Sequence, residues 1–234
     1  MSSSSTSSMP SWEAATLHRN HRVSPGLHLL TLDVSERLAA AFHAPGQYHR
    51  VRVASGDDAY FAIASAPGSR RFEYLVKASG GTATEWAKLA PGAQVEVSPP
   101  EGPGFPLEHS VGSDLLLVGT GTGFAPLWSV IQSILPRRDR FAQVHALWGS
   151  NTAADLAWHE RFAEVRKAGI TVEPVLFAGE PGWQGKRGRV QDHLPAVSTS
   201  ARAFLCGHEG MIADVTTLLG QRGVPAASIF LNVP

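Results

Sequence analysis

The chain has 234 residues, of which 43% are hydrophobic and 17% are charged, a composition typical of a globular protein with room for two domains. Its 20 basic residues balance 20 acidic ones, which leaves no electrostatic footprint for nucleic acid, and no apolar stretch is long enough to span a membrane. The single cysteine, Cys206, excludes an intramolecular disulfide and an iron–sulfur cluster held by four cysteines of this chain.

The first ten residues, MSSSSTSSMP, are rich in serine. They lack the apolar core of a secretory signal and the arginines of a transit peptide. This composition predicts a disordered tail over residues 1–10. We therefore expect a cytoplasmic location.

Short strand-like segments separated by turn signals fill residues 11–108. We expect strands at Thr16–Val23, Leu27–Val34, Gln47–Val53, Phe61–Ala64, Phe72–Lys77 and Gln94–Val97. Strands at this close spacing predict an antiparallel six-stranded β-barrel. One helix is expected within them, over Thr82–Leu89, where Thr82 and Glu85 have the spacing of a capping box.

From Asp114 the chain alternates strand-like and helix-like segments. We expect strands at Leu115–Val118, Val144–Trp148, Thr171–Leu176, Ala203–Cys206 and Ile229–Asn232. Helices are expected at Pro126–Leu135, Leu156–Ala168 and Glu209–Arg222. This alternation predicts a five-stranded parallel α/β domain over residues 114–234, with helices on both faces of the sheet.

A glycine-rich turn, Gly119–Gly123, lies between the first of these strands and the helix that contains Pro126. Backbone N–H groups and the positive end of a helix dipole converge at such a turn, where they form an anion site. The usual ligand is a nucleotide pyrophosphate. A merely flexible turn is the alternative, and the flanking strand and helix argue against it.

Four motifs resemble those of one protein family, and they occur in the family's order. They are Pro45-Gly46-Gln47-Tyr48, the YFAIAS segment Tyr60–Ser65, the turn Gly119–Pro126, and the CGHEGM segment Cys206–Met211. On these motifs the chain is identified as similar to the ferredoxin–NADP reductase superfamily, without an iron–sulfur domain. The resemblance implies an FAD-binding β-barrel over residues 11–108 and an NAD(P)-binding domain over residues 114–234.

The resemblance also implies which residues hold FAD. They are Phe61, Ala62, Ile63, Ala64 and Ser65 along the ring system, and Val76, Lys77, Gly81, Thr82, Ala83 and Thr84 near the diphosphate. Three positions depart from the family pattern, because Ala59 replaces an arginine, Phe61 a tyrosine and Ala62 a serine. Lys77 is the preferred substitute for the missing arginine, with Arg50 and Arg52 as alternatives.

For the pyridine nucleotide, the resemblance implies contacts from three turns. The residues are Gly119, Thr120, Gly121, Thr122, Gly123, Ala125, Pro126, Gly149, Ser150, Cys206, Gly207, His208, Glu209 and Met211. Cys206 would position the nicotinamide ring and would not act as a nucleophile. His208 replaces a family proline, and it either contacts the cofactor or caps the next helix.

The choice between NADH and NADPH depends on the turn Gly149-Ser150-Asn151. A 2′-phosphate usually needs a basic residue there, and none is present. The sequence therefore favours NADH slightly, with Arg187 and Arg189 as alternative ligands for a 2′-phosphate.

These features predict an NAD(P)H-dependent flavin oxidoreductase that passes hydride from nicotinamide to FAD. Electrons would continue to an unidentified acceptor, either a redox protein or a small molecule, and no metal, nucleic acid or membrane partner is expected. A flavin-free nucleotide-binding or regulatory subunit is one alternative, because Ala59 and Ala62 remove flavin contacts. An electron-transfer subunit of a larger complex is the other, since Gly102–Leu107 resembles such subunits of the dihydroorotate dehydrogenase type.

Overall fold

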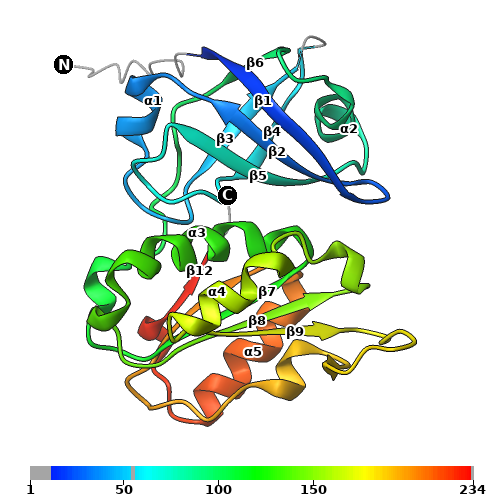
Figure 1. The fold of residues 1–234 in the computed structure, drawn as a ribbon. Helices are drawn as coiled ribbons and strands as arrows, with labels where there is room; N and C mark the ends of the chain where they lie inside the picture. Colours follow the sequence, from blue (N-terminus) through cyan, green and yellow to red (C-terminus); the bar gives the residue numbers. More distant parts are fainter. Residues whose placement is uncertain (1–11, 54–55, 233–234) are drawn as a thin grey trace, which may run out of the picture.

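The structure of the protein is a computed structural model that describes residues 12–53 and 56–232. The tail predicted over residues 1–10 lies outside these residues. A β-barrel and an α/β unit lie one above the other in Figure 1, with helix α3 between the two sheets.

The N-terminal unit is a six-stranded antiparallel sheet with the strand order β4-β3-β6-β1-β2-β5. Its strands are β1 (Glu13–Ser24), β2 (Leu27–Asp33), β3 (Tyr48–Arg52), β4 (Asp58–Ala62), β5 (Arg71–Lys77) and β6 (Gln94–Val97). The two end strands approach each other just after β4, where the Ala64 N–H donates to the Glu73 carbonyl at 2.8 Å. The predicted barrel is confirmed.

Two helices cover the barrel, and only one of them was expected from the sequence. Helix α1 (Glu36–Ala41) is short; Ser35 caps it, and it buries Leu38 and Ala39 in the barrel core. Helix α2 (Gly81–Lys88) occupies the predicted place, but the predicted capping box is wrong. The N-cap is Gly80, because Thr82 is buried and its hydroxyl donates to the Asp57 carbonyl at 3.1 Å.

The C-terminal unit is a six-stranded parallel sheet with the order β10-β9-β8-β7-β11-β12. Its strands are β7 (Leu115–Thr120), β8 (Val144–Ser150), β9 (Thr171–Leu176), β10 (Lys186–Arg187), β11 (Arg202–Cys206) and β12 (Ile229–Leu231). The predicted parallel fold is confirmed, with six strands in place of five. The extra strand, β10, has two residues, too few for a recognisable sequence pattern.

Three helices accompany this sheet: α3 (Phe124–Ile134), α4 (Phe162–Lys167) and α5 (Glu209–Gln221). The long helix predicted over Leu156–Ala168 is wrong in its first half, which contains only the 3-10 turn His159–Arg161 before α4 begins. Leu156 and Trp158 are both buried, and residues two apart point to different sides of an α-helix. One helix could not bury both against the same surface.

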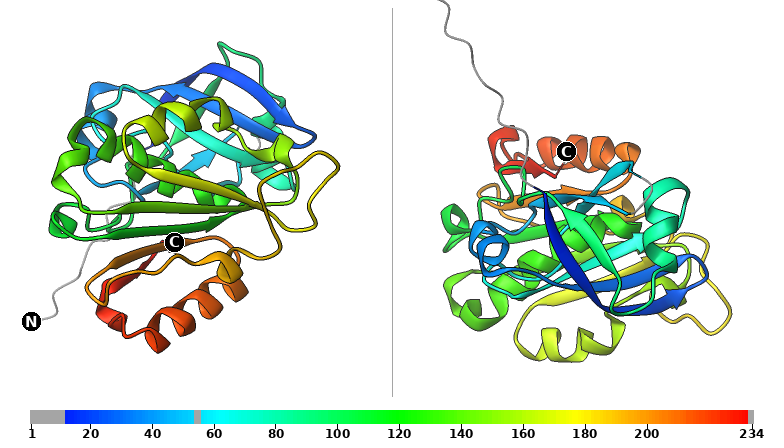
Figure 2. Two further views of the ribbon diagram at one scale, coloured as in Figure 1. Left: turned by 60° about the horizontal axis from the view of Figure 1, so that its bottom comes forward. Right: turned by 90° about the horizontal axis from the view of Figure 1, so that it is seen from above.

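The parallel sheet buries both of its faces. Leu115 and Leu117 of β7 pack in the cluster that contains α3, whereas Leu116 and Val118 pack in the cluster that contains α5. The left view of Figure 2 shows α5 on the face of the sheet that is turned away from the barrel. No helix among the described residues is both long and apolar enough to cross a membrane.

Helix α3 fixes the segment that follows β4. The Ser129 hydroxyl donates to the Ser65 carbonyl at 2.6 Å, and the Gln132 amide donates to the Ala64 carbonyl at 2.8 Å. Phe105, from the segment between the two sheets, stacks on Phe204 of β11 with ring centres 4.7 Å apart. The barrel wall and the glycine-rich turn that precedes α3 are thereby held next to each other.

Candidate functional site

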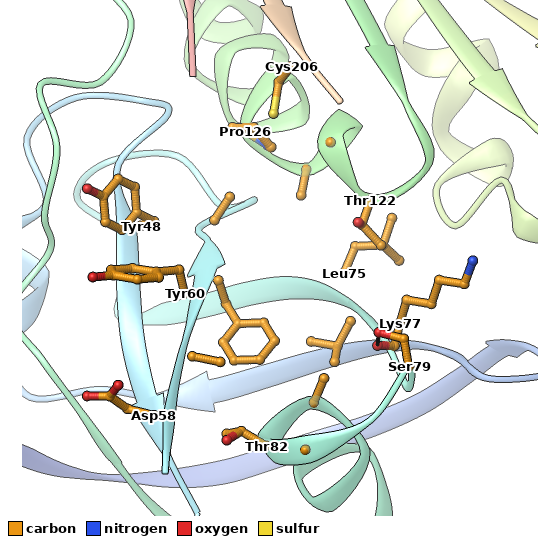
Figure 3. Close-up of a pocket in the computed structure, with 18 of the residues that line it drawn as sticks. Tyr48, Asp58, Tyr60, Leu75, Lys77, Ser79, Thr82, Thr122, Pro126 and Cys206 are labelled. Atoms are coloured by element: carbon orange, nitrogen blue, oxygen red, sulfur yellow. Dashed lines mark hydrogen bonds between the residues drawn. The ribbon is translucent and has the colours of Figure 1, made fainter. Parts of the chain in front are cut away.

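A cavity of about 830 Å³ opens between the barrel and the C-terminal ends of the parallel strands. Parallel sheets bind ligands at this edge. Figure 3 shows Cys206 and Pro126 of the α/β unit at one end of the cavity and Thr82 of the barrel unit at the other. A ligand in this cavity would therefore contact both units.

The start of helix α2 forms one end of the cavity. Gly80 and Gly81 have φ angles of +125° and +47°, a conformation that glycine adopts without strain. The N–H groups of Gly81, Thr82 and Ala83 donate to no backbone carbonyl among the described residues. Lys77 also lines the cavity, and in Figure 3 its ammonium group points away from Thr82. Free N–H groups suit a diphosphate, and a lysine in the same lining adds a positive charge.

The glycine-rich turn forms the opposite wall. Gly121–Gly123 is a 3-10 turn that continues into α3, and Thr122, Gly123, Ala125 and Pro126 line the cavity. Below the turn, the Trp148 indole N–H donates to the Gly121 carbonyl at 3.0 Å, and the Trp148 ring stacks on Phe124 at 4.4 Å. These contacts hold the start of α3 at a fixed orientation.

Two turns of the α/β unit pack backbone against backbone. A Cβ atom on Gly123 would lie 2.6 Å from the Cα of Gly207, and a Cβ on Gly207 would lie 2.2 Å from the Thr120 hydroxyl oxygen. The same hydroxyl oxygen accepts a hydrogen bond from the His208 N–H at 2.9 Å. This close approach sets where Cys206 stands relative to the glycine-rich turn.

Cys206 ends β11 and contributes its side chain to the cavity lining. Burial raises the pKa of its thiol from 9.0 to about 12. The group therefore stays protonated at neutral pH, whereas a nucleophilic cysteine needs its thiolate. A protonated thiol is suited to packing against the ring of a ligand and is not suited to nucleophilic attack on that ring.

About half of the predicted cofactor residues line the cavity. They are Phe61, Ala62, Val76, Lys77, Gly81, Thr82, Ala83, Thr122, Gly123, Ala125, Pro126 and Cys206. The others are not among the lining residues: Ile63, Ala64, Ser65, Thr84, Gly119, Thr120, Gly121, Gly149, Ser150, Gly207, His208, Glu209 and Met211. Several of these residues have structural roles that explain their place.

Met211 is 5% exposed and packs in the core between α5 and the sheet, a structural role that accounts for its burial. His208 is the N-cap of α5, and its Nδ1 accepts from the Gly210 N–H at 3.1 Å. Of the two roles expected for this histidine, the structure shows the cap. Ile63 and Ala64 are fully buried.

Sequence reasoning missed several lining residues: Tyr48, Asp57, Asp58, Tyr60, Leu75, Ser79, Gly80 and Asn232. Two signals were available. Tyr48 ends the PGQY motif, and Ser79-Gly80 directly precedes the predicted helix. The rings of Tyr48 and Tyr60 contact edge to face at 5.4 Å, which only the pairing of β3 with β4 could reveal.

Among the three basic residues considered for a diphosphate, only Lys77 lines the cavity. Arg50 pairs with Glu101 at 2.9 Å, and Arg52 pairs with Glu96 at 3.5 Å. Arg187, considered for a 2′-phosphate, donates to the Trp183 carbonyl at 2.8 Å. No group of His, Cys, Asp and Glu within residues 12–53 and 56–232 could hold a metal ion.

The residues present fit FAD in shape and backbone chemistry. The cavity is long enough to join an apolar wall, with Phe61 and Ala62, to the free N–H groups at α2. The fit is poorer in side-chain polarity, because Ala59 and Ala62 supply no polar group and Asp57 and Asp58 add carboxylates. Asp58 is partly neutralised by Arg50, at 3.6 Å.

Comparisons with known proteins agree with this arrangement. Residues 117–217 match the family model for the oxidoreductase NAD-binding domain. Ferredoxin–NADP reductase B of Sorangium cellulosum is 31% identical over 192 residues, which cover 74% of this chain and 76% of that protein. The anthranilate 1,2-dioxygenase electron transfer component of Acinetobacter baylyi is 27% identical, with 89% of this chain and 63% of that protein covered.

Among solved structures, a ferredoxin NADP+ reductase from Neisseria gonorrhoeae with bound FAD and NADP superimposes with a TM-score of 0.81 at 20% identity. The match covers 94% of this chain and 97% of that one. This similarity shows the fold alone, and the sequence match to the Sorangium cellulosum protein shows the family. The chain belongs to the ferredoxin–NADP reductase family.

Proposed function

We propose that the protein is an NAD(P)H-dependent FAD oxidoreductase. The observation that carries this proposal is the single cavity lined both by the start of α2 and by the glycine-rich turn with Cys206. When bound, the two cofactors supply the chemistry, which is hydride transfer from nicotinamide to flavin. The protein binds and orients them, and no side chain needs to act as a general acid or base in that transfer.

Each end of the cavity has its own task in this proposal. The N–H groups at the start of α2 and the Lys77 ammonium bind the FAD diphosphate, and Phe61 packs on the ring system. The glycine-rich turn binds the pyridine nucleotide pyrophosphate. The Cys206 thiol stays protonated because its pKa is raised. Its side chain limits where the nicotinamide ring can lie.

We propose NADH as the preferred donor. The turn after β8, Gly149-Ser150-Asn151, carries no cation for a 2′-phosphate. Arg187 is already bonded to the Trp183 carbonyl, which makes it a poor substitute. The acceptor is either a partner redox protein or a small molecule, a proposal supported by the relative named as an electron transfer component.

The flavin-free subunit remains the second candidate, because specific observations favour it. Ala59 and Ala62 remove polar flavin contacts, and Asp57 and Asp58 place negative charge in the cavity lining. Repulsion between these carboxylates and a diphosphate would weaken FAD binding. The third reading, a subunit that transfers electrons within a larger complex, uses the same cavity as the first and differs only in its acceptor.

The deciding experiment is an absorption spectrum of the purified protein, recorded as isolated and after addition of FAD and gel filtration. Retained flavin bands that bleach under anaerobic conditions with NADH, and more slowly with NADPH, would support the proposed activity and donor. Bleaching that is faster with NADPH would overturn the choice of donor. A protein that retains no added FAD, while still binding a pyridine nucleotide, would favour the flavin-free subunit.

A further inference from the structure

A second cavity, of about 330 Å³, lies on the other side of the segment that links β4 to β5. It shares no lining residue with the cofactor cavity. Its walls come from β1, β2 and β5 of the barrel unit and from α3 and the turn before α4 in the α/β unit. A ligand bound here would therefore touch both units without entering the candidate cofactor site.

Three guanidinium groups line this cavity: Arg19, Arg71 and Arg161. Arg19 forms no ion pair and no side-chain hydrogen bond with any residue that the structure describes, and its electrostatic neighbour is Glu73. Arg71 donates a hydrogen bond from its Nε to the Asp33 carboxylate at 3.0 Å. Since each guanidinium has five N–H donors, both groups keep donors for a ligand.

Arg161 is held in place from three sides. Its guanidinium lies over the Trp128 ring at 5.3 Å, its Nε is 3.4 Å from Glu164, and a terminal nitrogen is 3.5 Å from the Gln132 side-chain oxygen. These contacts are long for hydrogen bonds, so they orient the group and leave much of its donor capacity unused. A planar, oriented guanidinium is suited to bidentate contact with an oxyanion.

Glu73 is the one carboxylate among the lining residues of this cavity. Its burial raises its pKa, and Arg161 and the Gln132 hydrogen bond oppose that rise only in part. Inside the cavity the three cations meet one carboxylate, Glu73, whose ionisation is disfavoured, while Asp33 and Glu164 pair with Arg71 and Arg161 outside the lining. Among the other lining groups, the Ser65 hydroxyl can donate to an oxyanion, whereas the Ser69 hydroxyl already donates to the Arg71 carbonyl at 2.7 Å and the Gln132 amide to the Ala64 carbonyl at 2.8 Å.

We propose that this cavity binds a small oxyanion, the phosphate or carboxylate group of a metabolite, between Arg161 of the α/β unit and Arg19 and Arg71 of the barrel. Charge-assisted, bidentate contacts of this kind are the strong hydrogen bonds of protein sites. Because the cations belong to different units, the anion links the units directly. The cavity volume admits inorganic phosphate or a small phosphorylated or dicarboxylate molecule.

Binding there would act on the cofactor cavity through one short segment. Ala62 lines the cofactor cavity and Ser65, three residues later, lines the second cavity. The Ser65 carbonyl accepts from Ser129 of α3, the helix that begins at the glycine-rich turn. The bound anion would hold this segment and α3 together. The proposal does not depend on which cofactor occupies the first cavity.

The test uses the full chain and inorganic phosphate, with malonate as a dicarboxylate probe and chloride at matched ionic strength as the reference. Phosphate or malonate at ten times its dissociation constant should raise the melting temperature by about 3–6 °C above the chloride value. Isothermal titration calorimetry should give one site per chain. Response to one anion only would identify the preferred oxyanion and still support the site.

Arg19→Ala and Arg161→Ala should each abolish most of this rise. Arg70→Ala is the matched control, because it removes the same charge from the neighbour of Arg71 without touching the cavity. Lys77→Ala tests which of the two cavities binds the anion. If the anion bound at the start of α2, the rise in melting temperature would depend on Lys77 and not on Arg19. No excess stabilisation over chloride, or a rise retained in both cavity variants, would overturn the proposal. Circular dichroism in chloride confirms that each variant folds.

Discussion

The Cα of Gly207 lies only 2.6 Å from the position that a Cβ atom on Gly123 would occupy. Two turns from distant parts of the sequence thus meet through their backbones, which brings Cys206 to the glycine-rich turn. Any side chain at either glycine would push the turns apart. The geometry of the end of the cavity that Cys206 and the glycine-rich turn line depends on this contact.

Gly207→Ala should lower the free energy of unfolding by about 1–3 kcal/mol, the usual cost of overpacking. Its φ of +139° adds backbone strain for alanine. Pyridine nucleotide affinity should fall with it, as measured by calorimetry, because Cys206 and the turn Gly121–Gly123 separate. Gly220→Ala is the control, since no atom lies within 4 Å of the new Cβ and alanine favours the helix. Equal effects of the two substitutions would contradict this account.

Lys77→Ala should weaken FAD binding by roughly tenfold, the effect of losing one charge-assisted phosphate contact at a partly solvated site. Flavin fluorescence titration measures the change. Lys88→Ala removes the same charge from the last turn of α2, away from the cavity, and should leave the affinity unchanged. If both variants bind FAD as tightly as the native protein, Lys77 is not the diphosphate ligand.

His49 makes the barrel sensitive to acid. Burial lowers the pKa of its imidazole from 6.5 to about 4, although the hydrogen bond to the Ser98 carbonyl partly opposes that shift. Above pH 6.5 the ring is neutral in both the folded and unfolded chain and contributes no pH dependence. Between pH 6.5 and pH 4 the His49 imidazole is protonated in the unfolded chain and neutral in the folded chain. The free energy of unfolding therefore decreases by roughly 3 kcal/mol as the pH falls over this range.

His49→Gln keeps a donor for Ser98 and cannot titrate, so its stability should fall less steeply over this pH range. Urea unfolding of both proteins at pH 7, 5.5 and 4.5 measures the difference in slope. His21→Gln, at an exposed position of β1, is the comparison variant and should keep the native slope. Identical slopes for His49→Gln and the native protein would refute the prediction.

Cys206 should react slowly with thiol reagents. With a pKa of about 12, its thiolate fraction at pH 8 is on the order of a thousandfold below that of an unshifted thiol. Alkylation by iodoacetamide can be followed cleanly by mass spectrometry, because the chain has one cysteine. The urea-unfolded protein is the reference, and native alkylation within tenfold of its rate would contradict the buried, protonated state.

If Cys206 only positions the nicotinamide, Cys206→Ser should still reduce bound flavin at a measurable rate. The smaller hydroxyl should raise the dissociation constant for the nucleotide or slow the anaerobic bleaching modestly. Stopped-flow absorption at the flavin bands separates the two effects. Complete loss of bleaching in a folded, FAD-loaded variant would show that the thiol has a chemical role.

Local patterns in the sequence were enough for the main architecture. The alternation of apolar residues and the placement of turn signals predicted the barrel, the parallel sheet and α2, α3 and α5, because these features depend on residues close in the chain. The Gly119–Gly123 turn could be recognised for the same reason, since a strand, a turn and a helix in direct succession define it. Cys206 at a strand end was also visible from local pattern.

Long-range packing decided the rest. Leu156 and Trp158 are buried in the same core cluster, which one continuous helix could not achieve, so the helix that local periodicity favoured does not form there. Strand β10 exists only because two residues pair with β9. By its sequence position Arg50 was a possible diphosphate ligand. In the structure Arg50 pairs with Glu101 across the barrel, whereas Lys77 lines the cavity. The sequence by itself determined most of the strands and helices and the place of the Gly119–Gly123 turn. The tertiary structure alone decided which side chains face each cavity, because side chains far apart in the chain compete for the same partners.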